Sequence, residues 1–275
     1  MSNTPRPYAE VIGDPIAHSK SPVIHNFWLE ELEIDAEYRK TCVTREELPG
    51  YFLQRRADPD WLGCNITIPH KITALDYVDD PGGVRERIGA INTVACETGG
   101  PLIGTNTDAG GFLQPLLARQ WHGGHAILVG TGGAAQAIGF ALRSVGVSAL
   151  TIVARDAAKG QALLGRLGMD GMVRDFAAPL PAADLLVNAT SLGMTGQPAY
   201  APDLAALPTS ALVYDIVYAP LETPLLAAAR KRGLETLDGL EMLIGQAALA
   251  FDIFFDAPAP RERDAALRER LLAPA

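Results

Sequence analysis

Residues 126–142 read AILVGTGGAAQAIGFAL, an uncharged run that approaches the length of a membrane-spanning helix. Its glycines fall after an apolar run typical of a buried strand and before an amphipathic segment, so a strand, a tight turn and a helix account for it better. The turn reads G-x-G-x-x-A. Glycines there let backbone N–H groups approach a pyrophosphate at the positive end of the helix, although a glycine-rich turn without a ligand stays an alternative.

Apolar runs of the same kind flank this turn, separated by helical segments: AILVG, ALTIVA, DLLVNAT and ALVYDIV. Nearly continuous apolar runs belong to a parallel sheet that is buried on both faces. A helix at residues 223–232 and a short strand at 234–237 follow. We therefore predict a Rossmann-like, parallel-sheet, dinucleotide-binding domain over residues 108–238.

The segments on either side of this domain predict a second one. Short apolar runs alternate with helical patterns, which implies parallel strands covered by helices, and the chain turns helical again from residue 239. Ser21 and Pro22 are expected to supply the N-cap and first position of a helix. The fold class is α/β with two domains, the second comprising residues 1–107 plus 239–275. Its expected strands cover residues 8–13, 36–43 and 62–68, with a helix at 45–56.

Composition excludes several classes of protein. The 275 residues carry 23 Lys+Arg against 32 Asp+Glu, a formal charge of −9, so nucleic acid is not expected as a partner. With 48% hydrophobic and 20% charged residues the chain is globular, not disordered and not a membrane protein. Cys42, Cys64 and Cys96 fit neither a disulfide framework nor a metal site, and the five histidines lack ligand spacing. We expect no metal and no signal peptide, and hence a cytoplasmic location.

The end of the second apolar run bears on cofactor choice. An acidic residue there favours NAD, whereas an arginine can pair with the 2′-phosphate of NADP. Arg155 comes first and Lys159 lies four residues on, which favours NADP, while Asp156 would repel a phosphate if it faced one. We interpret Asp156 as part of a solvated loop and expect NADP, with NAD as the alternative.

A second group of polar residues lies outside the dinucleotide-binding part, at strand ends and helix starts, where α/β sheets present ligand sites. Capping or turn roles explain Ser21, Asn92 and Asp108 equally well. Lys71 is different, because it is expected in the first turn of a helix, where the helix dipole disfavours a cation. It needs a partner, and Asp108 is a candidate. The four stretches are residues 19–22, 65–71, 90–93 and 106–108.

Together these stretches resemble the shikimate dehydrogenase family over nearly the whole chain. The resemblance is carried by PIAHSKSP, NITIPHK, GAINTV, NTDAGG, GTGGAA, VNATSLGM, DIVY and DGLEMLIGQAA. It implies an open α/β substrate-binding domain, a Rossmann-like NADP domain and an active site in the cleft between them. The implied activity is the reversible NADPH-dependent reduction of 3-dehydroshikimate to shikimate in the chorismate pathway of aromatic amino-acid biosynthesis.

The resemblance also implies the site residues. Lys71 and Asp108 would form the catalytic pair. The substrate would be bound by Ser19, Ser21, Asn65, Thr67, Lys71, Asn92, Asp108, Tyr218 and Gln246, the serines and Tyr218 at its carboxylate. The cofactor would be bound by Gly130, Gly132, Gly133, Ala134, Arg155, Lys159, Thr190 and Gly239. Asp156 departs from the family, whose NADP-dependent members often carry Thr there.

Two other functions stay open. One is an NAD-preferring quinate/shikimate dehydrogenase of the same superfamily. The other is a catalytically silent dinucleotide-binding regulator, which the presence of both Lys71 and Asp108 disfavours. The expected partner is a small-molecule substrate, with neither nucleic acid nor membrane. The oligomeric state is left open, with a homodimer among the alternatives.

Overall fold

A computed structural model describes residues 6–96 and 100–273, and its backbone forms two compact units. The first unit comprises Met1–Arg85, Gly89–Thr107 and Gln246–Ala275, and the second comprises Glu86–Ile88 and Asp108–Gly245. One division lies between Thr107 and Asp108. The other falls inside a long helix, after Gly245, whereas the predicted boundary precedes that helix at residue 239.

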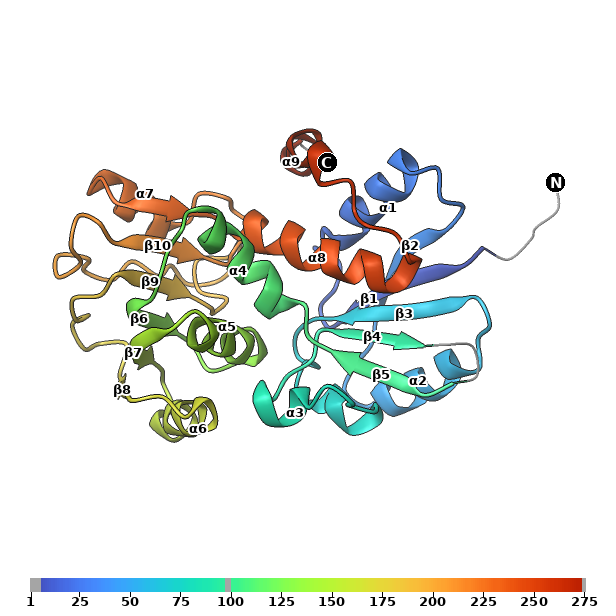
Figure 1. Cartoon of the computed structure of the whole chain (residues 1–275), viewed down its shortest axis with the longest axis horizontal. Coiled ribbons are helices and arrows are strands. Elements are labelled where there is room, and N and C mark those ends of the chain that lie inside the picture. The colour runs from blue at the N-terminus through green and yellow to red at the C-terminus, as the bar shows by residue number, and fades with distance from the viewer. Residues whose placement is uncertain (1–5, 97–99, 274–275) are drawn as a thin grey trace. The chain divides into compact units, whose positions relative to one another are not determined.

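A mixed five-stranded sheet forms the centre of the first unit, in the order β2-β1-β3-β4-β5 (Figure 1). β1 pairs in parallel with β2 and β3, and β4 is antiparallel to β3 and β5. Its elements are β1 (Tyr8–Gly13), α1 (Ser21–Glu31), β2 (Glu37–Cys42), α2 (Leu48–Arg56), β3 (Trp61–Ile66), the 3-10 helix η1 (Thr73–Tyr77), α3 (Val84–Arg87, which reaches the second unit), β4 (Thr93–Cys96), β5 (Leu102–Thr105), the C-terminal part of α8 (Gly239–Phe255), the 3-10 helix η2 (Arg261–Arg263) and α9 (Asp264–Leu272).

Helices α1 and α2 cover opposite faces of this sheet. Glu10 on β1 accepts hydrogen bonds from Tyr51 (2.8 Å) and Arg55 (2.6 Å) of α2. Tyr38, which pairs with Ala9, the residue before Glu10 on β1, points to the other face and stacks on His25 of α1. The chain thus passes from β1 through α1 to β2 on one side, and then through α2 to β3 on the other side of β1. Ligands bind at the carboxyl ends of strands where the strand order reverses in this way.

The second unit holds a six-stranded parallel sheet in the order β11-β10-β9-β6-β7-β8. Counted from β6, the order is the 3-2-1-4-5-6 of dinucleotide-binding sheets, so the predicted Rossmann-like class is confirmed. Its elements are α4 (Asp108–Ala118), β6 (Gly124–Val129), α5 (Gly133–Ser144), β7 (Val147–Val153), α6 (Ala157–Leu167), β8 (Gly171–Arg174), β9 (Leu185–Asn188), β10 (Leu212–Asp215), α7 (Pro224–Lys231), β11 (Glu235–Leu237) and the start of α8.

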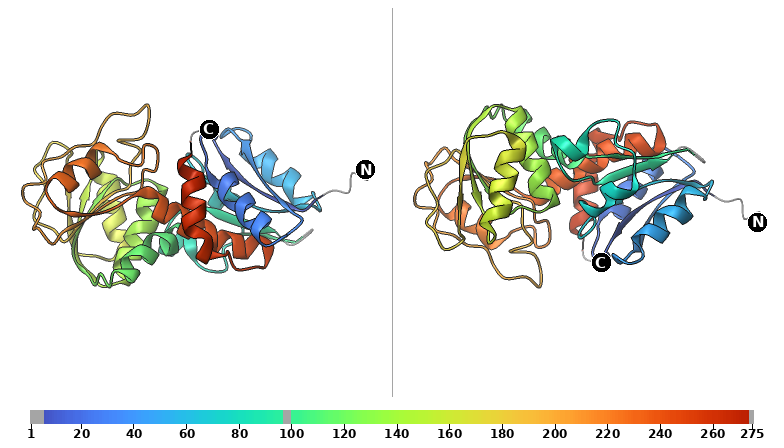
Figure 2. Two further views of the ribbon diagram at one scale, coloured as in Figure 1. Left: turned by 90° about the horizontal axis from the view of Figure 1, so that it is seen from above. Right: turned by 90° about the horizontal axis from the view of Figure 1, so that it is seen from below.

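The run at residues 126–129 of β6 is fully buried, as expected for a central strand with helices on both faces (Figure 2). Ile127 and Val129 belong to the apolar cluster that includes Leu225 and Leu226 of α7, while Leu128 faces α5. Burial of each such side chain contributes about 1.5–3 kcal/mol. The described residues contain no helix that is long and apolar enough to cross a bilayer.

Two local predictions were wrong or incomplete. Helix α1 begins at Ser21, and Lys20 occupies the N-cap position without a side-chain cap, so Ser21 is not the N-cap. Strand β8 was not predicted, because its four residues lie at the sheet edge, partly exposed, and lack an apolar run.

Candidate functional site

The carboxyl edge of the first sheet gathers polar side chains from three strands. β3 and β5 run in the same direction, and β4 between them runs the opposite way. The carboxyl ends of β3 and β5 therefore lie beside the start of β4. Asn65 lies at the end of β3, Asn92 and Thr93 lie at the start of β4, and Thr107 follows β5. Gln246 reaches this edge from α8.

These five side chains form one hydrogen-bonded cluster, the Asn65–Gln246 network. Asn65 Nδ2 donates to Thr93 Oγ1 (3.0 Å) and to the Asn92 carbonyl oxygen (3.2 Å). Asn92 Nδ2 donates to Thr107 Oγ1 (2.9 Å) and Gln246 Oε1 (3.1 Å), and Asn92 Oδ1 accepts from the Thr107 N–H (2.6 Å). The amide planes are therefore fixed from both ends.

The network is buried, with Asn65 4%, Asn92 2% and Gln246 7% exposed. Buried polar groups are costly when unpaired and rigid when fully hydrogen-bonded, so the side chains hold defined orientations. A rigid set of donors and acceptors at a strand edge suits a ligand that carries several hydroxyl groups in fixed positions.

The other polar residues predicted for the first unit lie around the same edge. Thr67 follows β3, and its N–H donates to the Ile12 carbonyl oxygen of β1 (2.9 Å). Ser19 lies between β1 and α1, and Ser21 is the first residue of α1; the Ser21 N–H donates to Ser19 Oγ (3.4 Å). Two hydroxyls and a helix start lie together here, as binding of a carboxylate requires.

Lys71 lies half-buried in the turn between β3 and η1, and not in the first turn of a helix. The prediction that a helix dipole disfavours the charge of Lys71 was therefore wrong, and it gives no argument for a function of this residue. Its carbonyl oxygen accepts the N–H of Ile91 (2.8 Å), which ties the turn to the segment that carries Asn92.

The glycine turn of the second unit fits a pyrophosphate. Gly130 has φ +111°, which favours glycine, and a Cβ there would press on Thr190 and on the Ala189 backbone. Gly132 is the extended N-cap of α5, and a Cβ there would meet nothing within 4 Å. Open space thus lies over the start of α5, which begins at Gly133, and the residues present fit a dinucleotide at this turn.

A largely buried cluster of hydrogen-bonded side chains, the Asn188–Asp215 cluster, supports this turn from the neighbouring strands. Asn188 Oδ1 accepts from the N–H (3.1 Å) and Oγ1 (2.7 Å) of Thr190, and Asn188 Nδ2 donates to Asp215 Oδ1 (2.9 Å). Thr223 Oγ1 donates to Asp215 Oδ2 (2.7 Å). Desolvation raises the pKa of Asp215, although these hydrogen bonds oppose the shift. The Asn188–Asp215 cluster holds Thr190 against Gly130.

Other residues predicted for the second unit have mixed outcomes. Gly239 packs on the backbone of Ile216 and Val217, which a Cβ would overlap, so its observed contact is with the protein itself. Asp108 is buried and begins α4. Tyr218 follows β10, and burial raises the pKa of its phenol.

The segment after β7 clarifies the role of Asp156. Asp156 is the N-cap of α6: one carboxylate oxygen accepts from the N–H groups of Ala158 (3.0 Å) and Lys159 (3.2 Å). Its other oxygen lies 3.9 Å from Lys159 Nζ. Asp156 is exposed and precedes α6, which agrees with its interpretation as part of a solvated loop, and its role as the N-cap was not predicted. Arg155 and Lys159 are both exposed beside this cap.

Sequence reasoning missed two kinds of residue. Tyr38, which donates to Asn65, gave no signal because its contact depends on strand register. Asn188 and Asp215 did carry a signal, since each is a polar residue that closes an apolar run. Within residues 6–96 and 100–273, no group of three or more His, Cys, Asp or Glu is placed to hold a metal ion.

The fold and the glycine turn define a two-unit α/β protein of the dinucleotide-dependent class. The family model described as shikimate dehydrogenase substrate binding domain matches residues 11–94, and that described as shikimate 5′-dehydrogenase C-terminal domain matches residues 239–266. The chain is 54% identical to a shikimate dehydrogenase (NADP(+)) of Sphingopyxis alaskensis, over 97% of both chains. It belongs to the shikimate dehydrogenase family, a family of oxidoreductases.

Solved structures agree with this assignment. A shikimate 5-dehydrogenase of Thermus thermophilus, in complex with NADP(H) and shikimate, is similar with a TM-score of 0.84, at 36% identity, over 96% of this chain and 99% of that one. A quinate dehydrogenase of Corynebacterium glutamicum, in complex with NAD, has a TM-score of 0.83 at 30% identity, over 97% and 99%. The fold is therefore shared by enzymes with different substrates and cofactors.

Proposed function

We propose that this chain catalyses the reversible, NADP-dependent interconversion of 3-dehydroshikimate and shikimate. The observation that carries the proposal is the Asn65–Gln246 network. It joins the segments NITIP, AINTV and NTDAG with Gln246 through their own side chains. A hydroxylated ring needs such directional donors and acceptors.

The proposed binding roles follow the chemistry of each group. Ser19 and Ser21 would donate to the substrate carboxylate, with Tyr218 as a further donor, because hydroxyls and the start of α1 favour an anion. This local set of donors lets a chain of charge −9 bind an anionic substrate. The ring hydroxyls would be held by Asn65, Thr67, Asn92, Asp108 and Gln246.

Lys71 is proposed as the group that handles the hydroxyl proton. In the reduction direction its ammonium would donate to the carbonyl oxygen as negative charge develops there, and in oxidation the neutral amine would accept the proton back. The Asp108 carboxylate would accept hydrogen bonds from the ammonium and from a substrate hydroxyl, which orients both.

The cofactor would be held at the second unit. Gly130, Gly132, Gly133 and Ala134 would bind its pyrophosphate, with Thr190 and Gly239 nearby, and Arg155 and Lys159 would meet the 2′-phosphate. NADPH, when bound, supplies the hydride for the reduction. The cap role of Asp156 supports NADP, since its carboxylate is engaged with the start of α6.

The test is a set of steady-state assays that combines shikimate and quinate with NADP⁺ and NAD⁺. We expect the highest kcat/KM for shikimate with NADP⁺. A preference for quinate with NAD⁺ would instead assign the NAD-dependent quinate/shikimate dehydrogenase, the alternative that the resemblance to the C. glutamicum structure favours. Absence of oxidation with every pair would favour the silent regulator.

We further propose a homodimer located in the cytoplasm. Cys42 and Cys64 form no disulfide, which supports a reducing compartment. Light scattering of the purified protein tests the dimer, and a monomeric mass would contradict it. Cell fractionation tests the location.

A further inference from the structure

We propose that Tyr38 is a positioning residue for substrate binding: its phenol orients the Asn65 amide and, through it, the Asn65–Gln246 network. This inference rests on the proposed function. It concerns a residue that does not itself belong to the network and that comes from the edge strand of the sheet.

Strand register allows the phenol to reach Asn65. β2 and β3 both pair with β1, so Tyr38 and Asn65 lie on opposite sides of that strand. Tyr38 pairs with Ala9 of β1, and Asn65 pairs with Val11, two residues on, so all four side chains project from one face. Ala9 pairs with Tyr38 on one side and with Gly63 of β3 on the other, and its single methyl leaves the phenol room to cross β1. Tyr38 Oη then donates to Asn65 Oδ1 at 2.6 Å.

The direction of this hydrogen bond is determined by the other partners of Asn65. The Asn92 carbonyl oxygen can only accept, so the Asn65 amide must turn its NH₂ toward Asn92 and its oxygen toward Tyr38. The phenol is therefore the donor. Burial raises the pKa of Tyr38 well above its ordinary value, which keeps the donor proton in place.

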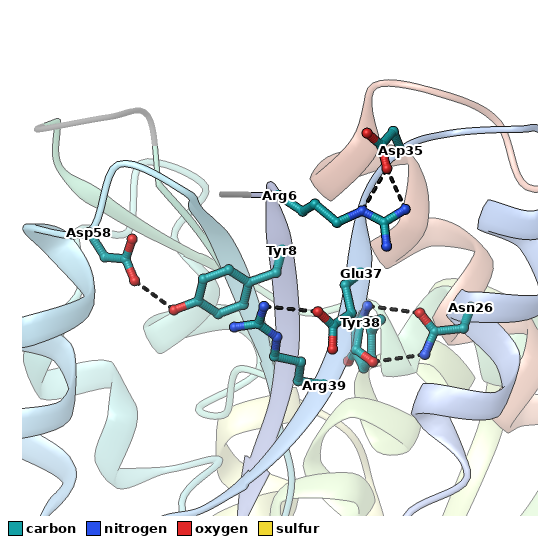
Figure 3. A network of polar contacts seen from close by, with 8 residues as sticks. All are labelled: Arg6, Tyr8, Asn26, Asp35, Glu37, Tyr38, Arg39 and Asp58. Carbon is teal, nitrogen blue, oxygen red and sulfur yellow. Dashed lines mark hydrogen bonds and ion pairs between the residues drawn. The ribbon is translucent and has the colours of Figure 1, made fainter. Parts of the chain in front are cut away.

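Tyr38 is held rigidly from the backbone and from the ring. Its N–H donates to Asn26 Oδ1 (2.9 Å) and its carbonyl oxygen accepts from Asn26 Nδ2 (2.8 Å), so two hydrogen bonds join α1 to the edge strand β2 (Figure 3). Its ring stacks on His25, with centroids 3.9 Å apart and planes 4° apart. A phenol fixed in this way gives Asn65 one preferred orientation.

The orientation of the Asn65 amide determines the hydrogen bonds of the other side chains in the network. With the Asn65 oxygen engaged, its NH₂ donates to Thr93 Oγ1, which in turn lies 3.2 Å from Asn92 Oδ1. Asn92 then presents its NH₂ to Gln246 and Thr107. Loss of the phenol hydroxyl would leave Asn65 Oδ1 buried without its donor, and the amide would lose the contact that orients it.

The experiment compares Tyr38→Phe with Tyr8→Phe. Tyr8 is a matched control, because its phenol also donates one hydrogen bond, to Asp58 (2.7 Å), but on the opposite face of the sheet (Figure 3). We expect Tyr38→Phe to raise the KM for shikimate about ten-fold, the effect of one buried hydrogen bond, with the KM for NADP⁺ unchanged. Tyr8→Phe should leave both KM values unchanged. Equal KM values for shikimate in the two variants would overturn the proposal.

A second measurement needs no substrate. The side-chain amide signals of Asn65 in ¹⁵N-labelled protein, assigned with Asn65→Asp, should move in Tyr38→Phe and stay in place in Tyr8→Phe. Unmoved signals in Tyr38→Phe would overturn the positioning role even if the enzyme is active. If the wild-type protein does not oxidise shikimate, the proposed function fails, and the amide signals still decide whether Tyr38 orients Asn65.

Discussion

Each of the two units places polar groups at the carboxyl edge of its own sheet, but one unit uses side chains there and the other uses the backbone. In the first unit the edge consists of side chains that bond one another, from Asn65 to Gln246. In the second it consists of the backbone turn at Gly130 and Gly132. A ring with hydroxyls in fixed positions needs oriented side chains, whereas a pyrophosphate, with many equivalent oxygens, is served by backbone N–H groups.

The two units should therefore also tolerate different substitutions. The side-chain network depends on every amide orientation, and one lost donor disturbs its neighbours. The backbone turn depends on the absence of side chains and on the Asn188–Asp215 cluster that holds Thr190 against it. Substitutions in the first unit should therefore change shikimate kinetics, and substitutions in the second should change cofactor kinetics.

The largest effect is expected for Lys71→Ala. If Lys71 transfers the hydroxyl proton, its loss lowers kcat by about 10²- to 10⁴-fold, with a much smaller change in the KM for shikimate. Lys40→Ala is the control, since Lys40 is an exposed lysine of the same unit that donates to the Ala17 carbonyl oxygen. Turnover of Lys71→Ala close to that of the wild type would remove Lys71 from the mechanism.

Gly132→Val tests the cofactor edge alone. The backbone at Gly132 has φ −74°, which any residue adopts, and a Cβ meets no protein atom within 4 Å, so the variant should fold normally. The added side chain would occupy the space proposed for the pyrophosphate. We expect the KM for NADP⁺ to rise about 10- to 100-fold with the KM for shikimate unchanged.

The control for this variant is Gly165→Val, in the exposed part of α6, where a Cβ also meets nothing within 4 Å. It should leave both KM values unchanged. A wild-type KM for NADP⁺ in Gly132→Val would show that the cofactor does not approach the start of α5.

Arg155→Ala tests which cofactor the second unit selects. Loss of a charge-assisted hydrogen bond to the 2′-phosphate should raise the KM for NADP⁺ about ten-fold and leave the KM for NAD⁺ nearly unchanged. Asp156→Asn keeps the N-cap and removes the negative charge, so it should lower the KM for NADP⁺ by a smaller factor. Equal effects of Arg155→Ala on both cofactors would show that Arg155 does not recognise the phosphate.

A separate effect concerns stability in acid, where the units differ in sign. Burial lowers the pKa of His25 in the first unit from 6.5 to about 3, so the unfolded state binds the extra proton between these values. Stability is lost as pH falls from 6.5 toward 3. Desolvation raises the pKa of Asp215 in the second unit above 3.8, so its contribution is lost as pH rises through the raised value.

Denaturant unfolding at several pH values measures the first of these effects. His25 packs against the rings of Trp28, Tyr38 and Phe251, of which only the Tyr38 phenol is titratable. The variant His25→Phe therefore keeps an aromatic ring in this place and removes the group that binds the proton. Relative to this variant, the wild type should lose roughly 1.4 kcal/mol per pH unit within the window. His122→Gln, at an exposed histidine, is the control. Parallel pH profiles of the wild type and His25→Phe would contradict the assignment.

The sequence predicted the architecture of the second unit best, because its strands are buried on both faces and read as apolar runs. The run at residues 126–129 and the glycines after it appear in the structure as β6 and the turn into α5. Strand β8 escaped prediction since an edge strand with partly exposed residues has no such pattern. Its place is fixed by pairing with β7, which only the fold reveals.

The candidate site was predictable residue by residue but not as a network. Polar residues at strand ends identified Asn65, Asn92 and their neighbours. The hydrogen bonds that orient them depend on strand order and register, as the reach of Tyr38 across Ala9 illustrates. Lys71 was assigned to a helix start, which the turn before η1 contradicts, because Pro69 marks a turn as readily as a helix.

One measurement tests the account most directly: 3-dehydroshikimate and NADPH are supplied to the purified protein, and the product is identified by NMR while NADPH consumption is followed. We predict one molecule of shikimate for each molecule of NADPH oxidised, with Lys71→Ala nearly inactive in the same assay. NADPH oxidation without formation of shikimate, or no reaction with 3-dehydroshikimate, would contradict the proposed function.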